Sequence, residues 1–217
     1  MPIQSDSFAN SSELDAFRLV TYPVMEHFYT IQGEGAFTGY PAYFIRLGGC
    51  DVQCFWCDVK DSWDESKHPR ISVDELANEV LASEAKIVVI TGGEPTIHNL
   101  DALTKVLHSI YVRTHIETSG SSPLTGEFDW VTLSPKKFKA PLETIYPFVD
   151  ELKVVVLRKN DLEYGESHAV KCVDGARLLL QPEWDNQEDS LPMIIDYVKR
   201  YPKWSISLQT HKFMGVR

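Results

Sequence analysis

The most regular feature of the chain is a series of short apolar runs, rich in β-branched residues, that end at glycine, proline or polar residues. Runs of this length and composition, followed by turn signals, are typical of strands buried in a sheet. We therefore predict strands at Ala42–Leu47, Lys86–Thr91, Arg113–Thr118, Trp130–Ser134, Glu151–Val156, Arg177–Gln181 and Trp204–Gln209.

Between some of these runs the apolar residues change to the spacing of an amphipathic helix, which buries one face. Ser72 is a candidate N-cap for the first such stretch, and Glu75 three residues later completes the sequence of a capping box. Helices are predicted at Ser72–Ser83, Asn99–Tyr111 and Leu191–Tyr201.

The alternation of strands with helices predicts a parallel α/β sheet, either open or closed into a barrel. The connections after Thr118 and after Ser134 are too short to hold a full helix. The predicted fold class is therefore α/β, a reduced βα barrel with parallel strands and few helices. The Ser- and Asp-rich segment Met1–Phe17 reads as a frayed leader, so we predict a flexible leader over 1–20 and one domain over 21–217.

Polar residues follow several of the predicted strands directly. In parallel βα folds the carboxyl ends of the strands lie at one edge, and that edge carries the active site. The pattern therefore predicts one shared pocket. The segments that would meet there are Thr91–Pro95, Glu117–Gly120, Ser134–Lys136, Gln181–Pro182 and Gln209–His211.

Composition and charge narrow the possible partners. Lys and Arg number 21 against 31 Asp and Glu, a formal charge of −10, whereas a nucleic-acid binder needs a basic surface to displace counterions from phosphates. A small-molecule substrate is favoured. No apolar run approaches the length of a membrane-spanning helix, and the first residues lack the pattern of a secretory signal. We expect a cytoplasmic protein that binds neither nucleic acid nor membranes.

Three of the four cysteines lie close together, at Cys50, Cys54 and Cys57. The spacing C-x3-C-x2-C can bring three soft thiolates to one centre from a single loop, and three ligands on a [4Fe–4S] cluster leave one iron open to a small molecule. The other interpretations are a zinc loop completed by Cys172 or a histidine, and cysteines that are merely buried. A structural zinc site, however, needs four closed ligands, and no His or Cys follows at finger spacing.

Six blocks between Glu26 and His211 match the pattern of a known family. They are Tyr29–Gly35, Phe44–Leu47, Gly49–Asp58, Val89–Pro95, Ile116–Gly120 and Leu208–Lys212. On these blocks the chain is similar to the radical S-adenosylmethionine superfamily. Within that superfamily it resembles the 7-carboxy-7-deazaguanine synthase family of queuosine and deazapurine biosynthesis, which the first and last blocks single out.

The resemblance implies a partial barrel of the radical S-adenosylmethionine type, with a [4Fe–4S] cluster on Cys50, Cys54 and Cys57. It also implies that S-adenosylmethionine chelates the open iron and yields a 5′-deoxyadenosyl radical on reduction. Gly92–Gly93 would let the backbone come close to this cofactor, and Glu94 would accept a hydrogen bond from its ammonium group. The cofactor-binding residues implied are Trp56, Cys57, Asp58, Gly93, Glu94, Ser134, Pro135, Lys136, Gln181, Pro182, Glu183 and Trp184.

The substrate implied by the family is 6-carboxy-5,6,7,8-tetrahydropterin, which carries a carboxylate and a guanidine-like pterin edge. The guanidinium of Arg46 would bind the carboxylate with two hydrogen bonds, and Gln32 would read the pterin edge. Hydrogen abstraction at C6, ring contraction and loss of ammonia would follow, a lyase reaction for which no general base stands out. The substrate-binding residues implied are Ile31, Gln32, Gly33, Arg46, Thr91, Gln209 and His211.

One position departs from the family pattern. The family usually has Thr or Ser directly after the Cys-Asp pair, where the hydroxyl binds a Mg²⁺ that also meets the substrate carboxylate, and this chain has Val59 there. Either a Mg²⁺ is held by the substrate and by other oxygens, such as those of Asp58 or Asp61, or the metal dependence of this protein differs. We therefore expect a weaker Mg²⁺ requirement.

The resemblance further implies a homodimer and a reductase partner such as flavodoxin or ferredoxin. Two alternative functions share parts of the pattern: a glycyl-radical-enzyme activase, which abstracts hydrogen from a partner protein, and a non-catalytic metal-binding module. The blocks Ile31–Gly35 and Gln209–Lys212 favour the deazaguanine interpretation over the activase. Cys172 is expected to be a small core or surface residue.

Overall fold

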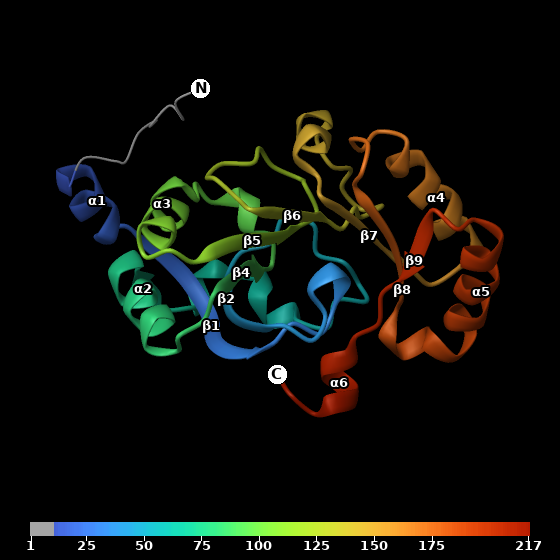
Figure 1. The fold of residues 1–217 in the computed structure, drawn as a ribbon, viewed down its shortest axis with the longest axis horizontal. Coiled ribbons are helices and arrows are strands. Elements are labelled where there is room, and N and C mark those ends of the chain that lie inside the picture. The colour runs from blue at the N-terminus through green and yellow to red at the C-terminus, as the bar shows by residue number, and fades with distance from the viewer. Residues whose placement is uncertain (1–10) are drawn as a thin grey trace, which may run out of the picture.

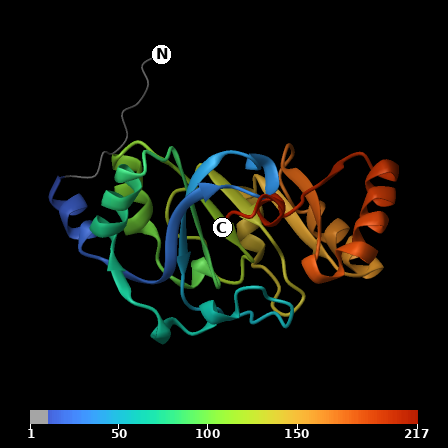
Figure 2. The same cartoon turned by 90° about the horizontal axis from the view of Figure 1, so that it is seen from below.

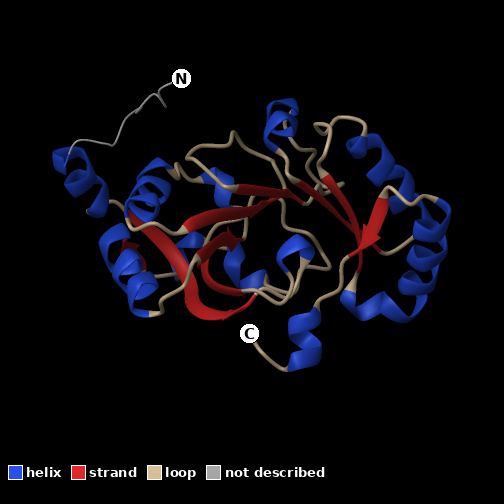
Figure 3. Cartoon of the chain, in the orientation of Figure 1, coloured by secondary structure: helices blue, strands red, loops and turns tan. Residues whose placement is uncertain are grey.

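The computed structural model describes residues 11–217, and its centre is a curved nine-stranded sheet (Figures 1 and 3). The strands are β1 (Thr21–Ile31), β2 (Pro41–Leu47), β3 (Arg70–Ser72), β4 (Ile87–Gly92), β5 (Arg113–Thr118), β6 (Trp130–Leu133), β7 (Glu151–Val156), β8 (Arg177–Pro182) and β9 (Trp204–Ile206). Their spatial order is β3-β1-β2-β4-β5-β6-β7-β8-β9. Strands β2 and β4 to β9 are parallel to one another, whereas β1 pairs antiparallel with both β2 and β3.

Helices lie on the outer side of this sheet (Figure 1). They are α1 (Ser11–Arg18), α2 (Val73–Ala82), α3 (Asp101–Ser109), α4 (Lys159–Ala169) and α5 (Gln187–Arg200). A short helix near the C-terminus, α6 (Thr210–Met214), lies apart from them (Figure 1). Residues 119–129, between β5 and β6, contain no helix, and the β6–β7 connection contains only a short 3₁₀ segment, Glu143–Phe148. The predicted reduced parallel βα barrel is therefore confirmed, and neither of the two connections contains an α-helix. No helix within residues 11–217 is long and apolar enough to cross a membrane.

The predicted strands are all present, most of them within one residue of the expected bounds. The last predicted strand extends to Gln209, but β9 already ends at Ile206. Ser72 caps α2 as expected, because its hydroxyl accepts a hydrogen bond from the Glu75 N–H (3.1 Å). The third predicted helix, α5, begins earlier than expected, at Gln187.

The sequence pattern missed β1, β3, α1, α4 and α6. In β1, the polar residues Glu26 and His27 interrupt the apolar run, so the strand lacks a clean period. In α4, Gly165 lowers the helical signal, but it allows close packing against β9. A Cβ at Gly165 would lie 3.3 Å from the Trp204 ring.

The N-terminal part departs from the expected leader. Residues 1–10 lie outside the described residues, but Ser11–Arg18 form α1, and Leu14 and Phe17 pack against the core. An ion pair also joins Arg18 to Asp74 of α2. The part of the predicted leader that the structure describes is therefore folded onto the body of the protein. The assignment of 21–217 to one domain stays a prediction.

The two faces of the strands differ in polarity, as β7 shows most clearly. Leu152, Val154 and Val156 point outward into a core cluster beneath the helices. Glu151 and Lys153 lie at the alternate positions and are buried on the opposite face, inside the barrel.

Strand register extends this polar inner face around the barrel. Arg46 on β2 pairs with Thr91 on β4, Glu117 on β5 pairs with Thr132 on β6, and Thr132 pairs in turn with Glu151 on β7. Residues in register project to the same face of a sheet. The interior of the barrel therefore carries a row of polar side chains.

The loop of residues 32–40, here called the β1–β2 loop, closes the barrel from the end opposite the strand carboxyl ends. Ile31 pairs with Pro41, so the loop leaves β1 beside the start of β2. It then reaches across to β7, where the Ala36 N–H donates to Glu151 (2.8 Å). Figure 2 shows this blue loop next to the red C-terminal segment. The expected pocket at the strand carboxyl ends is thus only part of the site, because the loop supplies its other end.

Candidate active site

The three clustered cysteines lie on the loop that follows β2, at the carboxyl edge of the sheet. Cys50, Cys54 and Cys57 form no disulfide; Cys54 is buried and the other two are partly exposed. Burial raises the pKa of Cys54 to about 11, so this thiol is protonated at neutral pH until a metal displaces its proton.

The loop after β4 packs tightly against this cysteine loop. The Gly93 N–H donates to the Leu47 carbonyl (3.1 Å), and the Glu94 N–H donates to the Gly49 carbonyl (2.8 Å). A Cβ at Gly93 would lie 2.2 Å from the Gly49 oxygen and 2.8 Å from Cys50 Cβ. No side chain fits between the two loops, so glycine is required at position 93 by the packing of the cysteine loop. The predicted approach of the cofactor to Gly92–Gly93 stays a prediction.

The Glu94 carboxylate is buried between the ends of β4 and β5, with 1% of the residue exposed. It accepts hydrogen bonds from the Thr96 N–H (3.1 Å), the Thr96 hydroxyl (2.7 Å) and the Ser119 N–H (2.7 Å). The hydroxyls of Thr118 and Ser119 contact it as well. A bond from a cofactor ammonium would have to replace or share one of these donors, and that role of Glu94 stays a prediction.

A cavity of about 400 Å³ extends from the cysteine loop to the β1–β2 loop. Its volume is that of a small-molecule site. Every residue predicted to bind cluster, cofactor or substrate lines this cavity except Pro135, which is buried next to Ser134. The structure therefore brings the predicted residues together, whereas their individual binding roles stay predictions.

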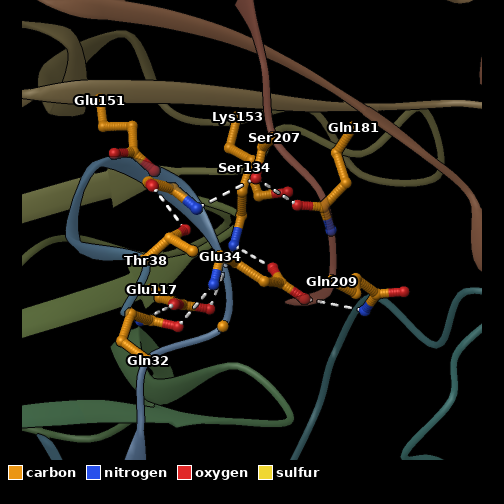
Figure 4. Close-up of polar contacts among 12 residues, drawn as sticks. Gln32, Glu34, Thr38, Glu117, Ser134, Glu151, Lys153, Gln181, Ser207 and Gln209 are labelled. Atoms are coloured by element: carbon orange, nitrogen blue, oxygen red, sulfur yellow. Dashed lines mark hydrogen bonds and ion pairs between the residues drawn. The ribbon is translucent and has the colours of Figure 1, made fainter. Parts of the chain in front are cut away.

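The end of the cavity at the β1–β2 loop, here called the floor, consists of Gln32, Glu34, Glu117, Lys153 and Gln209. Lys153 Nζ lies 2.5 Å from Glu34 Oε2 and 3.4 Å from Glu117 Oε2. The Gln32 amide donates to Glu117 Oε1 (3.0 Å), and the Gln209 amide donates to Glu34 Oε1 (2.8 Å). Figure 4 shows these side chains converging from separate parts of the chain. The floor is thus one connected polar network.

Sequence reasoning missed Glu34 and Lys153 as site residues. Lys153 lies with Glu151 in a run that was correctly predicted as a buried strand. The two residues occupy alternate positions, so their side chains point to the same face of the strand. Charged side chains in a buried strand must be paired, so this spacing could have identified an inward-facing polar side of β7.

Ion pairing determines which floor groups are charged. Burial alone would raise the pKa of Glu34, but the Lys153 ammonium beside it lowers that pKa below its ordinary value. Burial would likewise lower the pKa of Lys153, but Glu117 and Glu34 hold it above its usual range. Glu34 and Lys153 therefore remain ionised at neutral pH. Glu151 lies nearby, and burial raises the pKa of its carboxyl.

Two predicted substrate residues are held in place by neighbours. Arg46 Nε lies 2.8 Å from Glu26 on β1, which fixes the guanidinium and leaves its terminal nitrogens for a ligand in the cavity. His211 packs directly on Gly33, where a Cβ would lie 2.2 Å from the His211 Nδ1 atom. Burial lowers the pKa of His211, so this imidazole is neutral at physiological pH.

The donor set fits an iron–sulfur cluster better than a single metal ion. Within residues 11–217, no three His, Cys, Asp or Glu side chains converge closely enough to hold one ion. A [4Fe–4S] cluster binds its thiolates at different irons, so three cysteines spaced along one loop suit it. Cys172, the suggested fourth ligand of a zinc loop, packs instead against the core cluster of Leu162 and Trp204.

Comparisons with known proteins identify the family of the chain. The model of the Radical SAM superfamily matches residues 44–150. The 7-carboxy-7-deazaguanine synthases of Synechocystis sp. and Flavobacterium psychrophilum are 48% and 49% identical to this chain, over 91% and 89% of it and 95% and 92% of their own lengths. The chain belongs to the 7-carboxy-7-deazaguanine synthase family. Membership of this family makes it a radical S-adenosylmethionine enzyme, which implies a [4Fe–4S] cluster and S-adenosylmethionine.

A more distant family member has the same fold. The crystal structure of QueE from Escherichia coli superposes with a TM-score of 0.81 at 33% identity, covering 92% of this chain and 99% of that one. The 7-carboxy-7-deazaguanine synthase of Escherichia coli K12 is 34% identical over 90% of this chain. The reduced barrel is thus the fold of a family member as well as the fold predicted from the sequence.

The close approach at Gly93 generates a prediction about cluster binding. Gly93→Ala should lose most of its iron, because the added Cβ would displace Gly49 and Cys50. Iron and sulfide per chain after anaerobic reconstitution, together with the visible absorption of the cluster, measure this. Gly175→Ala is the control, since nothing lies within 4 Å of a Cβ there, although its φ of +93° brings strain of its own. A full complement of iron in Gly93→Ala would contradict the proposed packing role.

Proposed function

We propose that this protein converts 6-carboxy-5,6,7,8-tetrahydropterin to 7-carboxy-7-deazaguanine with loss of ammonia, as a radical S-adenosylmethionine lyase. The observation that carries the proposal is a single cavity that joins the cysteine loop to a floor of amides and carboxylates. Such a cavity can hold a redox-active cofactor at one end and a polar heterocycle at the other. Relatives that carry this name span nearly the whole chain.

The cysteine end of the cavity suits the cofactor. When bound, the cluster and S-adenosylmethionine would supply the 5′-deoxyadenosyl radical that abstracts hydrogen from substrate C6. The three thiolates would hold the cluster, and Gly93 lets the loop after β4 pack directly against the cysteine loop. Trp56 and Lys136 form part of the wall, with the Lys136 ammonium 5.4 Å from the centre of the Trp56 ring. This wall would orient the cofactor and keep water from the radical.

The floor end suits the pterin. The terminal nitrogens of Arg46 would hold the substrate carboxylate with paired hydrogen bonds. Gln32, whose amide donates a hydrogen bond to Glu117, would present its amide to the guanidine-like pterin edge. His211 and Gln209 would close the pocket from the C-terminal side.

The proposal also includes partners that the family resemblance implies. An electron for the cluster would come from a flavodoxin or ferredoxin in the cytoplasm, and the protein would act as a homodimer. Phe55, which lies between Cys54 and Cys57, is 64% exposed. An exposed aromatic side chain next to the cluster would give an electron carrier an apolar contact close to the metal.

The direct test is product formation under anaerobic conditions. The reconstituted protein would be given dithionite, S-adenosylmethionine and 6-carboxytetrahydropterin, and 7-carboxy-7-deazaguanine would be sought by mass spectrometry. We expect product from the wild-type protein and none from Cys54→Ala. If 5′-deoxyadenosine forms without deazaguanine, the radical chemistry stands and the substrate assignment is wrong. If neither forms despite an intact cluster, the proposed function is wrong.

Val59 generates a second prediction, on the metal requirement. Val59 lines the cavity but carries no ligand atom, and of the two suggested substitutes Asp58 lines the cavity whereas Asp61 does not. We therefore expect wild-type turnover to fall only slightly on chelation with EDTA. Val59→Thr adds a hydroxyl with almost no change of shape. It should lower the Mg²⁺ concentration that gives half-maximal turnover by roughly tenfold, the scale of a change in one metal contact.

The matched control for this prediction is Val59→Ala, which removes side-chain volume without adding an oxygen. Turnover would be measured against Mg²⁺ concentration for all three proteins. A sharp loss of wild-type activity in EDTA, or an equal Mg²⁺ response in Val59→Thr and Val59→Ala, would contradict the expected weak requirement.

A further inference from the structure

A second and much smaller cavity lies behind the floor of the main one. Its volume is about 10 Å³, close to the smallest space that can hold one water molecule. Gln32, Glu34 and Glu117 line both cavities, so the floor network is the partition between them. The far side of the small cavity is lined by His115, Trp130, Thr132 and Glu151. A space of this size with several polar walls is suited to an ordered water.

His115 supplies independent evidence for an occupant. The residue is 3% exposed, and within the described part of the chain its Nε2 atom has no hydrogen-bond partner. Burial lowers the pKa of His115 to about 4, so the imidazole is neutral and has one donor and one acceptor nitrogen. An orphaned buried polar atom is costly. A water in the adjoining cavity would satisfy it.

Glu151 is the group that most clearly lacks a counter-charge here. The residue is 2% exposed, and among the described residues its carboxyl accepts one hydrogen bond, from the Ala36 N–H (2.8 Å). Strand register places it beside Thr132, which is beside Glu117. Figure 4 shows Glu151 next to the β1–β2 loop, on the side away from Gln209. Glu151 therefore lies one polar side chain away from the main cavity.

The charges around Glu151 do not balance if all of them are ionised. The ionisable groups facing it from its own strand and from the packed elements are Lys153, Glu117, Glu34, His115 and, in register on β8, Arg177. Arg177 is exposed and His115 is neutral. Lys153 already pairs with two carboxylates, so a third buried negative charge would lack compensation. The neutral acid is the favoured form of Glu151.

We propose that protonated Glu151 and one water in the small cavity form a proton store that serves the main cavity through Glu117. The inference rests on the proposed function, which expels ammonia from a ring and leaves an aromatic product. When the carbon–nitrogen bond breaks, its electron pair goes to nitrogen. A proton then passes from Glu151 through the water to Glu117 and on to the departing nitrogen.

The cycle closes without an external acid, oxidant or reductant. On aromatisation the ring carbon loses a proton and the carbon–hydrogen electron pair stays in the ring as part of a double bond. That proton returns by Glu117 and the water to Glu151. Glu151 acts through Glu117 and is therefore a positioning residue that holds a proton in reserve.

The first test is spectroscopic and needs no substrate. The reconstituted full-length protein at neutral pH should show the infrared C=O band of a buried carboxylic acid, shifted in D₂O. Glu151→Gln should lose that band, whereas Glu143→Gln, at an exposed position, should keep it. Because glutamine has the shape of neutral glutamic acid and can still accept from Ala36, the urea midpoint of Glu151→Gln should not fall. Absence of the band, its survival in Glu151→Gln, or strong destabilisation of that variant would overturn the proposal.

The second test is kinetic. Glu151→Gln should form 7-carboxy-7-deazaguanine and ammonia about 10²-fold more slowly, the scale of one proton-transfer group, with an altered pH profile and unchanged iron content. Thr132→Val, which removes one polar wall of the small cavity, should slow the same step less. Wild-type product formation measured in parallel tests the proposed function, and the carboxyl band decides the protonation of Glu151 independently of it. If Glu151→Gln had the rate and the pH profile of the wild-type protein, the proposed proton store would be wrong.

Discussion

The buried ion pair between Glu34 and Lys153 is the contact on which the rest of the site depends. It joins residues that are 119 positions apart in the chain, one in the β1–β2 loop and one on β7. The side chain of Lys153 is 5% exposed, and an ammonium group at that depth is costly without a partner. The loop supplies this partner by crossing the barrel at its amino end. Because the loop is held there, Gln32 meets Glu117, Gln209 meets Glu34, and the cavity acquires a floor.

The two sequence blocks that distinguish this family from its superfamily meet beside this ion pair, where the Gln209 amide donates to Glu34. β1 and β9 are far apart in the sheet, yet the Thr210 N–H donates to the Gly33 carbonyl (2.9 Å), and His211 packs on Gly33. Neither block forms the floor alone. A buried ion pair often adds little net stability, but loss of one partner costs about 3–5 kcal/mol because the other charge remains buried. The contribution of Glu34 and Lys153 is therefore to fix one arrangement of the loop. The same shortage of positive charge leaves Glu151 as a neutral acid.

Local sequence patterns predicted most of the scaffold and the end of the cavity at the cysteine loop. β-Branched runs located the parallel strands, and the sequence singled out Gly93, although the structure shows it packed against the cysteine loop rather than against a ligand. The carboxyl-edge rule placed Thr91, Glu117 and Gln181 correctly at the cavity. The floor could not be predicted in this way, because it depends on a loop that crosses to strands more than a hundred residues later. β1 was missed for a related reason: its pairing on both sides stabilises a strand whose own pattern is irregular. Lys153 was overlooked because a lone lysine is usually a surface residue, although its position two residues after Glu151 places both side chains on one face of β7.

The most direct test of this account is backbone hydrogen exchange of the substrate-free protein, compared between wild type, Glu34→Gln and the exposed control Glu143→Gln. Glu34→Gln removes the charge that pairs with Lys153 but preserves the shape of the side chain. The account predicts faster exchange in residues 32–40 and 207–212 together, with β4 and β5 unchanged and the control like wild type. Unchanged exchange in both segments, or an increase spread evenly over the sheet, would contradict the central role of the ion pair.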